Sequence, residues 1–142
     1  MHGKIVASAL LVAALAWTDA AHAQGALAVG IPDGNPARGF KWDVRVNTPD
    51  AANLVLEDCR KAKNPRSGAA CKVIDTFTDQ CVAITSNGEP TAPVTAAGWG
   101  IGPDRVTAVN RALEKCDAMR KGRGPMCRLD GEGSLLCDGD AK

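Results

Sequence analysis

Hydrophobic and polar residues alternate over two short stretches of the chain, and each stretch carries one tryptophan. Residues 39–45 place Trp42 among apolar side chains on one side and charged side chains on the other, and residues 97–101 carry Trp99. A period of two predicts a β-strand with one buried face. A short apolar run precedes each stretch, at 26–29 and 82–84, and predicts a partner strand.

Two helices are expected after these strand pairs, because apolar residues there recur at every fourth position. The predicted stripes are Ala51, Val55 and Cys59 in the first helix and Ala108, Ala112 and Cys116 in the second. Thr48 and Asp104 precede the helices and have side chains suited to capping their first turns. A Gly/Pro-bearing loop follows each helix and leads to a further strand, at Cys71 and at Cys127.

The chain therefore repeats itself. Trp42 and Cys59 recur 57 residues later as Trp99 and Cys116, and the other two cysteines of the first copy recur after 56 residues. The element order is β-β-α-β, twice, which predicts an α+β fold with antiparallel sheets and one helix per repeat. A unit of this size has a marginal core alone. We expect one domain, 24–142, in which the repeats (about 25–81 and 82–138) share a core.

Residues 1–23 resemble a secretory signal peptide. Lys4 precedes an apolar run of about 13 residues, and Ala21-His22-Ala23 supplies small residues before a cut. That run is shorter than the roughly 20 residues of a membrane-spanning helix. We expect an exported protein, periplasmic or extracellular, without stable membrane insertion.

Six cysteines in a small exported chain predict a disulfide framework. They allow 15 pairings. If the pairing respects the copy symmetry, few choices remain, and we favour Cys59–Cys71 and Cys116–Cys127 within the repeats and Cys81–Cys137 between them. No C-x-x-C pair is present, so neither a zinc site nor a redox motif is expected.

The composition narrows the chemistry further. The two histidines, His2 and His22, lie in the leader, and the chain has no tyrosine. The usual general base and the commonest metal ligand are therefore missing from the mature chain. The formal net charge is +1, which provides no field for nucleic acid. We expect a protein that is not an enzyme and that uses no cofactor, metal or nucleic acid.

Several residues are candidates for binding. Basic residues follow both helices, namely Arg60, Lys61, Lys63 and Arg66 in the first copy and Arg120, Lys121, Arg123 and Arg128 in the second. They suggest a paired anion site, although cations also complement helix C-termini. Trp42 and Trp99 are expected in buried structural positions, from which one could line a groove between the copies. Phe77, beside threonines, is expected as an exposed anchor.

The carboxylates suggest two further kinds of site, a calcium-binding loop and a pair that hydrolyses a glycan. Asp130, Glu132, Asp138 and Asp140 lack the ligand spacing of a calcium-binding loop and are interpreted as turn and tail residues. Two carboxylates can hydrolyse a glycan. Glu57 and Glu114 match between the copies, and Asp75 and Asp79 flank Phe77, but no spacing selects a pair.

The chain resembles a bacterial secreted family called domain of unknown function 4189. The resemblance rests on the opening strand Gly25-Ala26-Leu27-Ala28, on Trp42 and Trp99, on the two helix ends at Cys59 and Cys116, and on the strands at Cys71 and Cys127. It implies an exported, disulfide-bonded, tandem ββαβ structure and no established activity.

The leading functional hypothesis is a non-catalytic binding module of inhibitor, immunity or effector type. Its partner would be a protein or an envelope component. The alternatives are a small carboxylate-dependent envelope hydrolase and a structural envelope component. The oligomeric state is left open.

Overall fold

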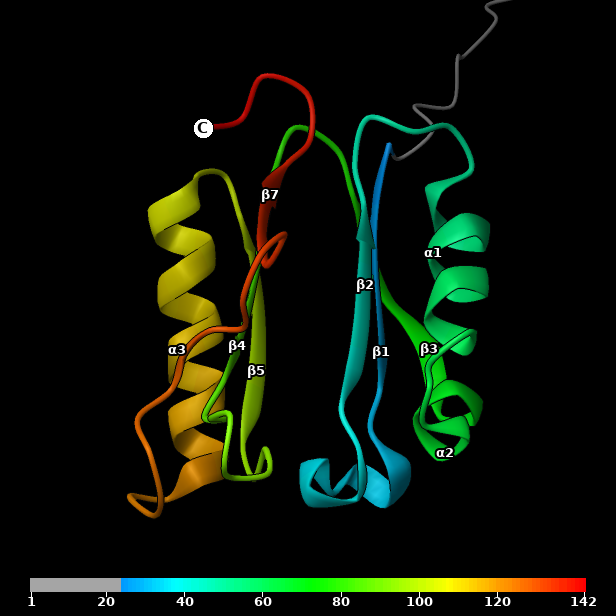
Figure 1. Ribbon diagram of the computed structural model, residues 1–142. Coiled ribbons are helices and arrows are strands. Elements are labelled where there is room, and N and C mark those ends of the chain that lie inside the picture. Colours follow the sequence, from blue (N-terminus) through cyan, green and yellow to red (C-terminus); the bar gives the residue numbers. More distant parts are fainter. Residues whose placement is uncertain (1–23) are drawn as a thin grey trace, which may run out of the picture.

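The computed structural model describes residues 24–142, so the expected signal peptide lies outside the described residues. Four layers are stacked in the order helix, sheet, sheet, helix (Figure 1). The first repeat forms one sheet and its outer helices, and the second repeat forms the other sheet and its outer helix. This arrangement confirms the expected α+β fold of two ββαβ units. No helix within residues 24–142 is long and apolar enough to cross a membrane.

The first half contains a three-stranded antiparallel sheet in the order β2-β1-β3. Its strands are β1 (Gly25–Gly30), β2 (Lys41–Arg45) and β3 (Cys71–Phe77). Helix α1 (Ala51–Arg60) covers the outer face with the predicted apolar stripe, and the short helix α2 (Pro65–Ala69) follows it. Two 3-10 turns, Pro32–Gly34 and Pro36–Arg38, connect β1 to β2.

The second half repeats this plan with one change. Strand β4 (Cys81–Ser86) lies between β5 (Ala97–Gly102) and a strand that is broken in two, β6 (Arg128–Leu129) and β7 (Leu135–Cys137). In the first half, β3 is continuous and only shifts register opposite Leu27 and Ala28. The second half has a five-residue loop, 130–134, at the corresponding place. Helix α3 (Arg105–Arg120) covers the outer face of this sheet.

The two sheets share one core, as the marginal size of each repeat predicts. Leu27 and Val29 of β1 face Val82 and Ile84 of β4 across the sandwich, and Phe77 is buried with them. Alternate residues of the central strands point outward instead and pack under the helices. Because each half supplies one wall of the central core, neither repeat can fold alone without exposing it.

Helix α3 approaches β5 closely because glycine occupies every second position of that strand. Gly98, Gly100 and Gly102 are the residues that face the helix. A Cβ atom added at Gly100 would lie 2.6 Å from the backbone nitrogen of Ala112 and 2.6 Å from Cβ of Arg111. The alternation around Trp99 predicts this strand, but the glycine stripe formed no part of that prediction. The stripe matches the small residues Ala108 and Ala112 on the facing side of α3.

Three disulfides join the pairs that the sequence analysis expects, Cys59–Cys71, Cys81–Cys137 and Cys116–Cys127. The expected role of Cys81–Cys137 as a link between the copies is wrong. Cys81 is the first residue of β4 and stands directly opposite Cys137 of β7. This bond therefore lies within the second sheet, because the linker between the halves ends just before Cys81.

The helix starts follow the predictions in part. Asp104 caps α3 by accepting the backbone N–H of Thr107 at 2.8 Å, and this hydrogen bond lowers the pKa of the Asp104 carboxyl. Thr48 does not cap α1; its hydroxyl donates to the carbonyl of Val46, and Asp50 precedes the helix in a left-handed conformation. Asn64 caps the unpredicted helix α2 through the N–H of Arg66.

Two carboxylates tie the halves together outside the shared core. Asp130, in the loop between β6 and β7, accepts the indole N–H of Trp42 on β2 at 2.6 Å and also bonds Ser86 of β4. Asp138 is 1% exposed and accepts the backbone N–H groups of Asn47 and Asp79 at 2.7 and 3.1 Å. Two of the four carboxylates interpreted as turn and tail residues therefore fasten the second half to the first.

Candidate functional site

An apolar hollow of about 300 Å³ lies where the two halves meet. Its apolar lining comes from both copies: Val29, Ile31 and Ile74 from the first, and Trp99 and Met119 from the second. Ala70 and Lys72 complete its edge beside the start of β3. We call this hollow the Trp99 groove. Its volume is at the lower end of the range for small-molecule sites, which are concave and mostly apolar.

The two tryptophans occupy matched strand positions but have different surroundings. Both are half-buried against the shared core, whereas the sequence analysis expects both to be buried. Trp42 is fixed by its hydrogen bond to Asp130. Trp99 lines the groove, and Nζ of Lys115 lies 4.1 Å from the centre of its ring, within the range of a cation–π contact. Trp99 is therefore the tryptophan that is positioned to meet a ligand.

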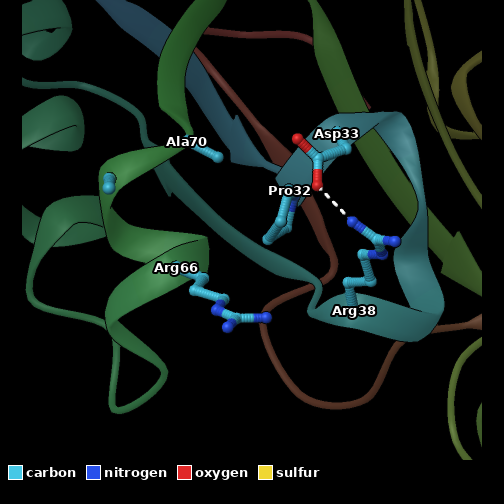
Figure 2. Close-up of a pocket in the computed structure, with 6 residues that line it drawn as sticks. Pro32, Asp33, Arg38, Arg66 and Ala70 are labelled. Atoms are coloured by element: carbon cyan, nitrogen blue, oxygen red, sulfur yellow. Dashed lines mark hydrogen bonds and ion pairs between the residues drawn. The ribbon is translucent and has the colours of Figure 1, made fainter.

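A second, more polar hollow of about 530 Å³ adjoins the Trp99 groove at Ala70. We call it the arginine hollow, because Arg38 and Arg66 extend into the same open space from opposite sides (Figure 2). Arg38 comes from the second 3-10 turn and Arg66 from α2. Asp33 forms an ion pair with Arg38 at 2.6 Å. The lining of the hollow thus holds two guanidinium groups and one carboxylate, which leaves a surplus of positive charge.

The Asp33–Arg38 pair is open to solvent, with side chains 73% and 57% exposed. Exposed pairs of this kind contribute at most about 1 kcal/mol, because water screens them and both side chains lose freedom. An incoming anion can therefore replace Asp33 at little cost. Arg66 forms no ion pair with any residue of the range 24–142.

A third hollow of about 400 Å³ is lined by three lysines, Lys41 at the start of β2 and Lys61 and Lys63 after α1, and two of them form ion pairs. Lys61 bonds Glu57 at 2.8 Å, which raises the pKa of Lys61, and Lys41 lies 3.7 Å from Asp43. Ser67 also lines this hollow, with a buried hydroxyl that has no partner within the described residues. Lysine ammonium groups lack the paired donors of a guanidinium group, so this hollow fits a carboxylate or phosphate less well than the arginine hollow.

The predicted basic residues do not form one paired site. Arg60 and Lys61 end α1, whereas Arg120, Lys121 and Arg123 end or follow α3, and both sheets lie between the two helices (Figure 1). Arg120 bonds Asp117 and the carbonyl of Gly124, and Lys121 ends the helix in a left-handed conformation. The basic residues at the end of α1 and those at the end of α3 stay predicted binding residues, as two separate groups.

Phe77 is not an exposed anchor. Only 3% of it is exposed, and it packs in the shared core. It ends β3 opposite Gly25, where a Cβ atom would lie 2.6 Å from Cδ2 of the Phe77 ring. The ring enters the core because its partner residue has no side chain, and the polar neighbours of Phe77 gave no sign of this.

The carboxylates do not gather into a catalytic or metal site. Glu57 lies on α1 and Glu114 on α3, in opposite outer layers. Within residues 24–142, no group of three or more potential ligands is placed to hold a metal ion. Of the side chains that line the Trp99 groove and the arginine hollow, Asp33 is the only carboxylate.

Comparison with known proteins places the chain in a family. The family described as "Domain of unknown function (DUF4189)" matches residues 22–131. The chain belongs to this family. No curated protein and no solved structure matches the chain. The matched region includes both hollows that meet at Ala70, so both lie within the domain that defines the family.

Arg66 is one of the basic residues expected after the first helix, but sequence reasoning missed Arg38, 28 positions earlier in the chain, and the hollow that the two arginines line together. They meet because the 3-10 turns and α2 lie at the same end of the first half (Figure 1). One local signal was present. Asn35-Pro36 and Asn64-Pro65 both match the start of a capped helical turn, and each asparagine does accept a backbone N–H, from Ala37 and Arg66 respectively.

Proposed function

We propose that this protein is an exported, non-catalytic binding module and that its ligand site is the Trp99 groove. Its target is an envelope component or an envelope protein that inserts an apolar group between the two halves. The observation that carries the proposal is the position of Trp99, which lines a concave apolar hollow whose walls come from both repeats.

The scaffold supports this function. Three disulfides and a shared core hold the groove walls in place before a ligand arrives. A preformed site binds more tightly because little conformational freedom is lost on binding. Disulfides persist in oxidising compartments, which agrees with export to the periplasm or beyond.

The hydrolase alternative has less support from the geometry. Glycoside hydrolysis uses two carboxylates on either side of the scissile bond. The Trp99 groove has no carboxylate in its lining, and the matched pair Glu57 and Glu114 is divided between opposite layers. Turnover of peptidoglycan or a common glycan by the purified protein, abolished by one Asp or Glu substitution, would overturn the binding proposal.

A neutral fluorescent probe tests the site directly. N-phenyl-1-naphthylamine is apolar and brightens when it leaves water, so we expect saturable enhancement with the mature protein. Trp99→Ala and Met119→Ala should each weaken this binding, Trp99→Ala by roughly tenfold or more, because a large aromatic wall is lost.

The control for these variants is Val106→Ala, which removes an apolar side chain that is 70% exposed and lies away from the groove. It should leave probe binding unchanged. Circular dichroism establishes that each variant is folded. Equal probe binding by the wild type and both groove variants would contradict the assignment of the site.

A further inference from the structure

The Trp99 groove and the arginine hollow adjoin at Ala70, which lines both of them, so an apolar hollow lies next to a cationic one. We propose that the ligand is a single-chain anionic amphiphile, with its chain in the Trp99 groove and its head group between Arg38 and Arg66. This inference rests on the proposed function, since it names the chemical class of the molecule that the same groove binds.

The apolar end fits a chain. A dry cavity of about 150 Å³ holds one benzene molecule, and the Trp99 groove has about twice that volume. Val29, Ile31 and Ile74 offer aliphatic walls, and Met119 adds a flexible side chain that adapts to the contour of a chain. Polar ligands gain little here, because the groove lining supplies few hydrogen-bonding side chains.

The cationic end fits an anionic head. Guanidinium groups bind carboxylate and phosphate oxygens through paired N–H donors, and Arg38 and Arg66 approach the same space from different elements (Figure 2). Asp33 balances one of these charges through an exposed contact that an incoming head group can replace. Carboxylate and phosphate heads share this chemistry.

The residue at which the two hollows adjoin has a small side chain. Ala70 lines both of them, and the neighbouring residues Asp33 and Gly34 line one each. In the proposed complex, the ligand passes over the small side chain of Ala70 from one hollow into the other. Lys72 lines the Trp99 groove, and Lys115 lies over the ring of Trp99. These two positive charges also favour binding of an anionic ligand over a cationic one.

The test uses displacement of N-phenyl-1-naphthylamine from the mature protein by four probes of equal chain length. They are dodecanoate, dodecyl phosphate, dodecanol and dodecyltrimethylammonium, each used below the concentration at which it forms micelles. We expect one or both anionic probes to displace the reporter at roughly tenfold lower concentration than the neutral and cationic probes. The anion that competes better identifies the head group.

The double variant Arg38→Gln/Arg66→Gln should lose this preference for anions and still bind the neutral reporter within about twofold of the wild type. Ala70→Phe should weaken binding of the anionic probes, because it places a large side chain where the two hollows adjoin. The matched control Arg105→Gln/Lys142→Gln removes two exposed cations, at the start of α3 and at the end of the chain, and should change nothing.

Equal displacement by all four probes, or an anion preference that survives in the double variant, would overturn this inference while the proposed function stands. Absence of reporter binding to the wild-type protein would contradict the proposed function itself. The two failures are therefore distinguishable.

Discussion

Replacing Gly100 with alanine tests the close packing of α3 on β5. The new Cβ atom would lie 2.6 Å from the backbone nitrogen of Ala112 and 2.6 Å from Cβ of Arg111. The end of a flexible side chain can change rotamer to relieve a clash, but backbone and Cβ atoms cannot move without moving the helix. The helix must therefore move away from the strand, and its small-residue stripe loses contact with the sheet.

The size of the effect follows from two opposing contributions. Forcing an extra carbon into a packed core costs about 1–3 kcal/mol. Replacing glycine also removes freedom from the unfolded chain, which offsets about 0.4–1 kcal/mol of this cost. We expect Gly100→Ala to lower the free energy of unfolding by about 1–2 kcal/mol, measured by urea denaturation with all three disulfides intact.

The repeat supplies a matched control. Asp43 holds the equivalent position in β2, next to Trp42 as Gly100 is next to Trp99, and it already carries a side chain beside α1. Asp43→Ala removes only a half-exposed contact with Lys41 and a local hydrogen bond, so its effect should be clearly smaller. If Gly100→Ala is as stable as the wild type, the close approach of α3 to β5 is wrong.

Three further predictions concern stability. Asp138→Ala should lower the free energy of unfolding by about 2–4 kcal/mol, because the backbone N–H groups of Asn47 and Asp79 lose a buried acceptor; unchanged urea denaturation would show that Asp138 does not fasten the second half to the rest of the fold. Cys81→Ala/Cys137→Ala should cost about 1.4 kcal/mol more than removal of the first-half disulfide, since the closed loops span 56 and 12 positions; the reverse order in denaturation would contradict the loop-closure reasoning. The pKa of Asp104 is lowered in the folded protein, so its stabilising contribution is present above the ordinary aspartate pKa near 3.8 and is lost as the pH falls through the lower folded value. Unfolding measured from neutral to acid pH should therefore show a shallower loss for Asp104→Ala than for the wild type, and parallel curves would argue against the cap.

The repeated cysteines and tryptophans made the element order predictable, because both copies had to satisfy one pattern. The copy symmetry also led to the three disulfide pairs that the structure contains. It misplaced Cys81 only by assigning it to the end of the first copy. Helix starts were less certain from local residues, since Asp104 caps α3 whereas Thr48 bonds a nearby carbonyl.

The candidate site was predictable only in outline. Both tryptophans were expected to be buried and structural, with a groove between the copies left open as an alternative for one of them, and Trp99 lines such a groove. The environment of Phe77 depends on Gly25, a cross-strand neighbour that no local pattern identifies. Arg38 and Arg66 share a hollow only because two short helical turns meet in space, so their relation became visible with the fold.

We propose one ligand site that spans the Trp99 groove and the arginine hollow. An NMR titration of isotope-labelled mature protein with dodecanoate tests it most directly, because every indole and backbone amide reports its own surroundings. We expect chemical-shift changes at the Trp99 indole and at the amides of Ile31, Ala70 and Ile74, and no change at the Trp42 indole. Shifts confined to the outer surface of α3 around Val106, or equal movement of both indoles, would contradict it.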